Sequence, residues 1–234
     1  DIGIDSFTVK EQLDTAYALE MSDIAKLLPE RPPYAHKGTF GKLLLIAGSS
    51  GMAGAAFLSA CAAYRMGAGL VRIYTTEDNR SILQQLIPEA IITTYTEYDE
   101  ASLLSVLEWA DAVCIGSGLG RSDVADLIVN TVLKEINVPC LIDADGINIL
   151  ATHPEWKNRL AEGNYVLTPH LKELSRLTGR PVNEIQMHRR EVLEQTARTL
   201  DVTLVQKDAR TFVGAKGRRM YVNLTGNAAM AKAG

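Results

Sequence analysis

The sequence predicts an α/β domain built on a mostly parallel, doubly wound sheet. Short apolar segments alternate with stretches of helical length along most of the chain, which is the pattern of β-α-β crossovers. The chain has 234 residues and is 47% hydrophobic, so it can bury a full core, and its length favours one large domain.

Residues 1–36 are predicted to lead into that domain, which we expect over residues 37–234. The lead-in is polar and helix-prone up to Leu27 and Leu28. The prolines that follow, Pro29, Pro32 and Pro33, prevent the helix from continuing.

The first core strand is predicted at residues 43–47, a continuous apolar run that ends before Gly48. Runs of this kind are buried on both faces of a parallel sheet. The unit of strand, loop and helix then recurs, with strands predicted at residues 70–74, 112–115, 140–142, 165–167 and 203–205. Residues 183–200 carry apolar side chains at helical spacing and are predicted to form one packing helix. A hairpin is predicted from residues 211–214 and 219–222.

Composition argues against several classes of function. The formal net charge of −4 gives no cationic surface for nucleic acid or anionic lipid, and the most apolar stretch, residues 51–71, is too short and too polar to span a bilayer. Cys61, Cys114 and Cys140 show neither CxxC nor disulfide-framework spacing, so we expect unreactive buried thiols. The sequence therefore predicts a cytoplasmic protein with no nucleic-acid or membrane partner.

Chemistry is expected in the loops after the strands, because ligands bind beyond the carboxyl ends of strands in an open α/β sheet. Two of these loops are rich in glycine, residues 48–56 and residues 116–122. Each precedes a predicted helix, where backbone N–H groups can hold an anion. The alternative for the first loop is that its small residues only let the helix pack closely.

Two further loops carry polar side chains. Asp143 and Asp145 are predicted either to contact a hydrated metal on substrate phosphates or to cap a helix and complement its dipole. His170 follows Thr168 and Pro169 at a strand end. Its imidazole is predicted to contact a ligand, with a helix-capping role as the alternative.

Taken in order, these loops resemble the nucleotide-dependent NAD(P)H-hydrate dehydratases, which have a ribokinase-like fold, a three-layer α/β/α sandwich. The resemblance covers nearly the whole chain. It rests on residues 36–41, 48–56, 65–71, 88–89, 118–120, 143–145, 167–170, 207–211 and 226–227. The opening residues 1–4 also resemble the tail of an epimerase domain to which this family is often fused.

The resemblance implies a repair reaction. ADP or ATP phosphorylates the hydroxyl on C6 of the hydrated nicotinamide ring (S form), and loss of phosphate then regenerates NADH or NADPH. Mg²⁺ and a homo-oligomer, such as a tetramer, are expected with it. Catalysis of this kind depends on positioning and charge stabilisation.

The family's ligand contacts fall on matching positions of this sequence. Substrate contacts fall on Ala55, Gly120 and His170, with Gly118, Asp145 and Asn227 as further candidates. The nucleotide contacts fall on Lys207, Asp208, Ala209, Arg210 and Thr211. The family's catalytic base, an Asp, is expected just after Gly234, together with the helices that complete the domain, so no catalytic residue is predicted within the chain.

Two positions depart from the family pattern. Asp208 stands where the family usually has Gly, and a carboxylate beside a phosphate site is unfavourable unless it points away or meets a metal. Leu171 and Lys172 stand before Glu173 where the family usually has Pro-Gly before that Glu. The departures predict altered nucleotide affinity and an altered grip on the substrate.

Three other functions compete with the dehydratase. A vitamin-precursor kinase of the same fold would phosphorylate an alcohol without elimination, and fold alone does not separate the two. A Rossmann oxidoreductase would need an acidic residue at the end of the second strand, where Thr75 and Thr76 precede Glu77. A catalytically inactive nucleotide-binding fragment is the third alternative.

Overall fold

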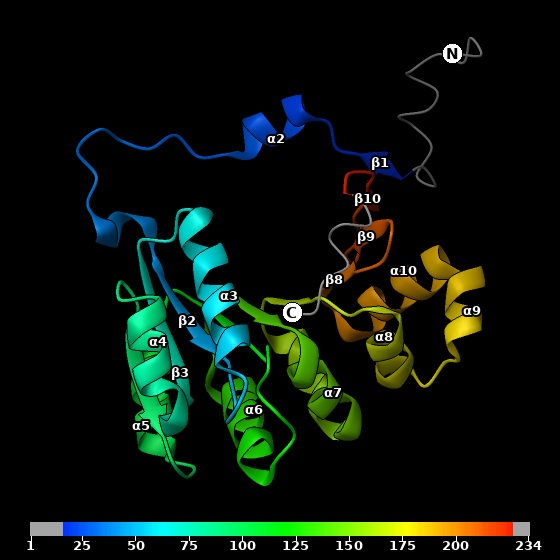
Figure 1. The fold of residues 1–234 in the computed structure, drawn as a ribbon. Coiled ribbons are helices and arrows are strands. Elements are labelled where there is room, and N and C mark those ends of the chain that lie inside the picture. Colours follow the sequence, from blue (N-terminus) through cyan, green and yellow to red (C-terminus); the bar gives the residue numbers. More distant parts are fainter. Residues whose placement is uncertain (1–15, 227–234) are drawn as a thin grey trace.

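The computed structural model describes residues 16–226, which form one ten-stranded sheet with helices on both sides (Figure 1). The expectations for residues 1–4, for Asn227 and for the chain after it lie outside the described residues. The strands are β1 Tyr17–Ala18, β2 Lys42–Ile46, β3 Leu70–Thr76, β4 Ile91–Tyr95, β5 Ala112–Ile115, β6 Cys140–Ile142, β7 Tyr165–Leu167, β8 Thr203–Gln206, β9 Thr211–Gly214 and β10 Tyr221–Asn223. The α-helices are α2 Met21–Leu27, α3 Ala53–Arg65, α4 Arg80–Leu86, α5 Glu100–Trp109, α6 Asp123–Glu135, α7 Ala144–Thr152, α8 Leu171–Thr178, α9 Val182–Met187 and α10 Arg189–Leu200. Shorter 3-10 helices span Lys37–Phe40, Glu77–Asn79 and Pro154–Glu162.

The predicted α/β class is confirmed, and the chain order of the strands locates the site. Their order in the sheet is β1-β10-β9-β8-β7-β6-β5-β2-β3-β4. From β2 the chain moves outward through β3 to β4 and then returns to the other side of β2 as β5, with all of these pairs parallel. The direction of winding therefore reverses between β2 and β5, and ligands of open α/β sheets bind at such a reversal.

The sheet differs from the sequence prediction at both edges. β4 was not predicted, although Ile91, Ile92 and the threonines after them are β-branched residues that favour a strand, and it pairs parallel with β3. The predicted hairpin of β9 and β10 is confirmed, and β10 pairs in turn with the two-residue strand β1 of the lead-in.

The core lies on both faces of the sheet. Alternate residues of β2 point to opposite sides, so Leu44 and Ile46 join the cluster under α5, α6 and α7, whereas Leu45 packs under α3 and α4. On the face of the sheet that α3 and α4 cover, three side chains of β6, β7 and β8 are partly exposed and belong to neither cluster. They are Leu141, Val166 and Val205.

The lead-in helix α2 is where the sequence predicts it, but none of its residues is buried. Besides the pairing of β1 with β10, Arg31 ties the lead-in to the body of the domain: its guanidinium donates to the Gly67 carbonyl at 2.6 Å and lies 4.0 Å from the centre of the Phe40 ring. Within residues 16–226 no helix is long and apolar enough to cross a membrane.

The predicted packing helix over residues 183–200 is in fact two helices. α9 and α10 are separated at His188, whose φ of −123° and ψ of 38° are not helical. Four apolar side chains of this stretch, Ile185, Val192, Leu193 and Ala197, are buried as expected, and a fifth, Leu200, is half-buried. The break leaves Arg189 as the first residue of α10, close to the segment after β8.

Candidate functional site

The two glycine-rich loops after β2 and β5 are joined by backbone hydrogen bonds. The Gly48 N–H donates to the Ser117 carbonyl at 3.0 Å, and the Ser49 N–H donates to the Gly118 carbonyl at 2.6 Å. These two amides are therefore used inside the protein and are not donors for an anion. The N–H groups at the start of α3 remain the candidates for that role, because the first turn of a helix lacks internal acceptors.

Two buried polar side chains on β3 and the turn after it hold the first loop in place, and the sequence prediction missed both. Thr75 donates to the Gly48 carbonyl at 2.6 Å. The Asn79 amide donates to the carbonyls of Gly48 and Ser49, each at 3.1 Å, and to the Thr75 hydroxyl at 2.9 Å. Thr75 is 0% and Asn79 1% exposed. The sequence signal is a pair of polar residues four positions apart where a buried strand ends.

The second loop needs glycine because other elements approach its backbone closely. Gly116 has φ of +120°, and a Cβ there would lie 1.9 Å from the Asp143 carbonyl oxygen. Gly118 has φ of +61°, and a Cβ there would lie 2.7 Å from the Ala55 Cβ. The small-residue interpretation therefore holds for the contact between this loop and α3.

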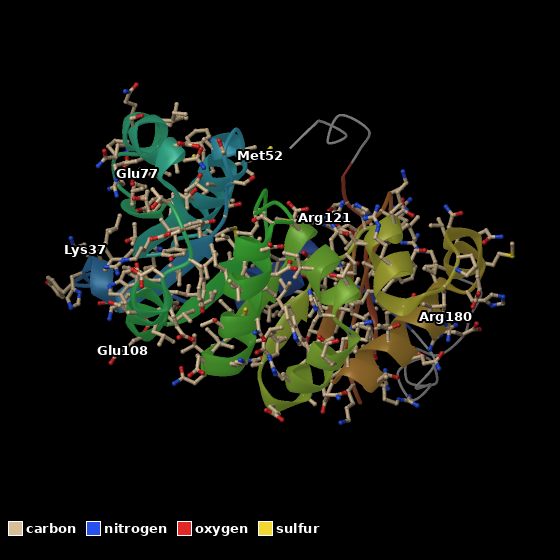
Figure 2. All side chains as sticks on the ribbon, turned by 90° about the horizontal axis from the view of Figure 1, so that it is seen from below. Lys37, Met52, Glu77, Glu108, Arg121 and Arg180 are labelled. Atoms are coloured by element: carbon tan, nitrogen blue, oxygen red, sulfur yellow. The ribbon has the colours of Figure 1, made fainter. Side chains whose placement is uncertain are left out.

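A cavity of about 360 Å³ lies where these loops meet the start of α7. Figure 2 shows the molecule from below, with Met52 of the first loop and Arg121 of the second labelled. The structure brings together three predicted site residues, Ala55, Gly118 and Asp145, in this cavity. Gly120 is linked to it, because its N–H donates to Asp145 Oδ2 at 2.9 Å. The lining residues are Met52, Ala55, Leu58, Ser59, Ser117, Gly118, Asp143, Ala144 and Asp145.

Asp143 connects this cavity with the segment predicted to bind the nucleotide. Its Oδ1 accepts the Thr168 hydroxyl proton at 2.7 Å and lies 2.5 Å from Lys207 Nζ. The side chain makes no capping hydrogen bond to α7, so the alternative interpretation of Asp143 as a helix cap is not what the structure shows. One carboxylate thus joins the loops after β6, β7 and β8 at the same edge of the sheet.

His170 caps helix α8. Its Nδ1 accepts the backbone N–H groups of Lys172 and Glu173 at 3.0 and 3.2 Å, and its Nε2 lies 3.3 Å from Glu173 Oε1. Glu173, buried, accepts the His170 N–H in return at 2.8 Å. Glu173, which matches the family pattern, therefore completes a capping box. Of the two roles considered for His170, the structure shows the helix-capping one. The imidazole is 47% exposed. The His170 backbone forms an isolated parallel β-bridge with Lys207.

Four of the five residues predicted to bind the nucleotide, 207–210, form the turn between β8 and β9, and the fifth, Thr211, is the first residue of β9. Lys207 points to Asp143, whereas the Asp208 carboxylate lies 3.2 Å from the Arg189 guanidinium at the start of α10. The Arg210 guanidinium donates to the Leu224 carbonyl at 2.8 Å. Asp208 is thus paired with a cation of the protein, which removes the objection to a carboxylate beside a phosphate site.

The described residues do not build a metal site on their own. Within residues 16–226 no group of three or more His, Cys, Asp or Glu side chains could hold an ion. One oxygen of each loop carboxylate is already engaged, Asp143 by Thr168 and Lys207, and Asp145 by Gly120. A Mg²⁺ ion at these loops would therefore need most of its six ligands from groups other than these two carboxylates.

Two of the cysteines, Cys114 and Cys140, are poor nucleophiles. All three are free thiols. Burial raises the pKa of Cys114 to about 12, and the nearby Asp143 charge adds to the increase. Burial likewise raises the pKa of Cys140 far above its ordinary value. Thiolate chemistry at these two positions is therefore suppressed near neutral pH.

Comparison with known proteins gives consistent matches. A family model described as NAD(P)H-hydrate dehydratase matches residues 43–234. A bifunctional NAD(P)H-hydrate repair enzyme of Coxiella burnetii is 37% identical over 216 residues, covering 92% of this chain and 43% of that protein. The chain thus spans less than half the length of that relative.

Two comparisons with Bacillus subtilis agree. Its ADP-dependent (S)-NAD(P)H-hydrate dehydratase is 37% identical over 209 residues, covering 88% of this chain and 72% of that protein. The crystal structure of its ADP/ATP-dependent NAD(P)H-hydrate dehydratase, co-crystallized with ATP/Mg²⁺, has a TM-score of 0.74 at 31% identity and covers 90% of this chain and 73% of that one.

Proposed function

We propose that this chain, which belongs to the NAD(P)H-hydrate dehydratase family, binds ADP or ATP beside hydrated NAD(P)H and serves the nucleotide-dependent dehydration of that damaged cofactor. The contact between Asp143 and Lys207 is the observation that carries the proposal. It joins the segment proposed to hold the nucleotide to the cavity proposed to hold the hydrated ring.

The proposed reaction has two steps. The terminal phosphoryl group of the nucleotide passes to the C6 hydroxyl of the hydrated ring, whose proton is removed. The C–O bond then breaks with departure of phosphate, the ring nitrogen's lone pair assists, and loss of a proton from the adjacent carbon restores the dihydronicotinamide. Phosphorylation matters because hydroxide is a poor leaving group and phosphate is a good one. The protein contributes positioning and charge stabilisation.

Each site residue has a stated part in the proposal. Lys207 offsets phosphate charge, with Arg210 and Thr211 as further contacts in the same turn and Ala209 contributing backbone. Ala55, Gly118 and Gly120 let the dinucleotide approach the backbone closely, while His170 and Asp145 contact its polar groups. Asn227 remains a proposed contact. Mg²⁺ would be carried by the nucleotide phosphates, whose charge it would neutralise.

The proposal assigns binding, and not proton removal, to the described residues. Asp143 Oδ1 already accepts from Thr168 and Lys207, and Asp145 Oδ2 accepts from Gly120, so both carboxylates are given positioning roles. The base is proposed to be an Asp after Gly234. A single-turnover assay of the 234-residue chain tests this: we expect negligible turnover, and substantial turnover would place the base within residues 1–234.

We also propose that the protein is cytoplasmic and assembles as a homo-oligomer. The three unpaired cysteines fit a reducing compartment. The lead-in leaves Met21 80%, Leu27 70% and Leu28 60% exposed, and a second copy of the chain would cover these apolar side chains. Sedimentation velocity of the chain and of the Leu27→Ser variant tests the assembly: we expect the variant to dissociate, and a monomeric wild-type chain would contradict the proposal.

Calorimetric titration tests the function without requiring turnover. We expect the chain to bind ADP or ATP and, separately, the S form of hydrated NADPH, with weaker binding of the R form. A chain that binds neither ligand overturns the proposal. Binding of nucleotide with vitamin-precursor alcohols but not hydrated NADPH would favour the kinase alternative, and binding of nucleotide alone would favour the inactive nucleotide-binding alternative.

A further inference from the structure

Arg189 is distant in the sequence from the predicted nucleotide contacts, but its side chain reaches the turn that contains them. It is the first residue of α10 and follows the break at His188. The break turns the chain so that this side chain extends toward the segment after β8 rather than along a continuous helix. Sequence periodicity assigned this stretch only to packing, so Arg189 has no part in the site as described so far.

The Arg189 guanidinium makes three contacts with the nucleotide turn, which we define as residues 207–211, and with Phe212 directly after it. One terminal nitrogen lies 3.2 Å from Asp208 Oδ2, and the other donates to the Arg210 carbonyl at 2.8 Å. The guanidinium carbon also lies 4.5 Å from the centre of the Phe212 ring. The contacts fall on alternate residues, so one planar group holds the Asp208 carboxylate, the Arg210 carbonyl and the Phe212 ring in a fixed relation.

These contacts are shielded enough to matter energetically. The Arg189 side chain is 18% exposed, compared with 35% for Asp208. A charge-assisted pair in a partly buried position is stronger than a surface ion pair, because solvent screens it less. The Asp208 carboxylate also accepts the Ala209 N–H at 2.8 Å, so its orientation is set from both sides.

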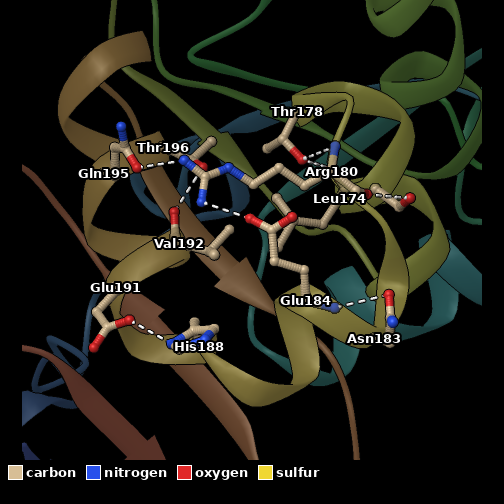
Figure 3. A network of polar contacts seen from close by, with 11 residues as sticks. Leu174, Thr178, Arg180, Asn183, Glu184, His188, Glu191, Val192, Gln195 and Thr196 are labelled. Atoms are coloured by element: carbon tan, nitrogen blue, oxygen red, sulfur yellow. Dashed lines mark hydrogen bonds and ion pairs between the residues drawn. The ribbon is translucent and has the colours of Figure 1, made fainter.

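Polar contacts link α8, α9 and α10 on either side of the break at His188 (Figure 3). Arg180, which follows α8, donates to Glu184 of α9 at 3.2 Å and to Gln195 of α10 at 2.5 Å. At the break, His188 Nδ1 lies 2.9 Å from Glu191 Oε2. The corner between α9 and α10, where Arg189 lies, is therefore held by polar contacts.

We propose that Arg189 is a positioning residue for the nucleotide. It pairs with the unusual Asp208 and holds the Arg210 carbonyl, so that the turn keeps the shape in which Lys207 faces the site. This inference rests on the proposed function, since it assumes that the nucleotide binds at residues 207–211. Arg189 itself does not touch the nucleotide in this arrangement, so its effect is on affinity through the shape and charge of the turn.

The test compares Arg189→Met with Arg198→Met, an exposed arginine at the other end of the same helix. Methionine keeps an apolar stem over Phe212 but removes the charge and both polar contacts. We expect the dissociation constant for ADP to rise about tenfold in Arg189→Met, as the loss of one charge-assisted hydrogen bond implies. The dissociation constant for hydrated NADPH is expected to stay within about twofold, and Arg198→Met is expected to leave both constants unchanged.

Rescue and coupling separate positioning from a general loss of structure. Arg189→Lys retains the charge beside Asp208 but not the two-armed contact, so an intermediate ADP affinity is expected. Adding Asp208→Gly to Arg189→Met should cost less than the two single effects combined, because the substitutions remove one interaction. An unchanged ADP affinity in Arg189→Met, or equal losses for ADP and hydrated NADPH, would overturn the inference. Absence of ADP binding by the wild-type chain would instead overturn the proposed function.

Discussion

Each of the two halves of the site is held in place by a different kind of interaction. The loops after β2 and β5 are joined by backbone hydrogen bonds and pinned by the buried Asn79. The turn after β8 is held by ion pairs of partly exposed side chains, Lys207 with Asp143 and Arg189 with Asp208. The first half should therefore respond to substitution as part of the fold, whereas the second should respond to charge and salt with little change in stability.

Gly116→Ala should have the largest effect. The added methyl would lie 1.9 Å from the Asp143 carbonyl oxygen at a φ of +120°, so the backbone must move. We expect a loss of about 4 kcal/mol or more in the free energy of unfolding, measured by urea denaturation. Gly51→Ala is the matched control, because its φ is +81° but a Cβ would meet nothing within 4 Å. It should cost only about 1–2 kcal/mol. Equal losses in the two variants would show that the loop contact is not tight.

Asn79→Ala should have the next largest effect, because it removes the donor from two loop carbonyls in a buried place. We expect a loss of about 2 kcal/mol, or about 4–8 °C in melting temperature. Affinity for hydrated NADPH should fall further than affinity for ADP. Asn158→Ala, at an exposed position, is the control and should melt as the wild type does. A melting temperature unchanged in Asn79→Ala would contradict the role given to this side chain.

Lys207→Met should change binding more than stability. The ion pair with Asp143 is partly exposed, so its removal should cost at most about 1 kcal/mol of stability. ADP affinity is expected to fall about tenfold. The wild-type affinity should also fall as salt rises from about 0.1 M to about 1 M, and the variant should show a smaller decrease. Lys134→Met, on the exposed end of α6, is the control; the same salt response in Lys207→Met and wild type would mean that Lys207 does not face phosphate.

The smallest effect concerns the thiol of Cys114, on the strand β5 that leads into the second glycine-rich loop. Because burial raises the pKa of Cys114 to about 12, only about one molecule in ten thousand carries the thiolate there at pH 8. Alkylation by iodoacetamide, followed by mass spectrometry, should therefore be slow at Cys114 and Cys140 in the folded chain and fast after unfolding. Rapid alkylation of folded Cys114 would show that β5 opens readily beside the second loop.

Local patterns predicted much of the fold. Six of the strands and the β9–β10 hairpin follow from apolar runs and turn residues, and the sequence singled out the loops after β2 and β5 but not the reversal of winding between these strands. Contacts between distant residues were not predictable. Asn79 and Gly48 are 31 residues apart, and backbone bonds between the loops leave no mark on the sequence. Arg189 was missed because a helical pattern continues through the break at His188.

Local patterns singled out the two glycine-rich loops, Asp145 and His170, whereas the resemblance to the family assigned ligands to them and added residues 207–211. Ala55, Gly118 and Asp145 line one cavity, and Lys207 contacts Asp143, which also lines it. His170 shows the difference between a position and a role. It lies at the predicted strand end, but its ring nitrogens are directed to the start of α8 and to Glu173.

Hydrogen–deuterium exchange of the chain, with ADP and separately with hydrated NADPH, tests the division of the site most directly. We expect ADP to protect the amides of residues 207–211, and hydrated NADPH to protect those of residues 50–55 and 118–120. The amides of Gly48 and Ser49 should exchange slowly without any ligand, because they already donate to the second loop. Protection by ADP of the two glycine-rich loops, with residues 207–211 unchanged, would contradict the placement of the nucleotide at the turn after β8.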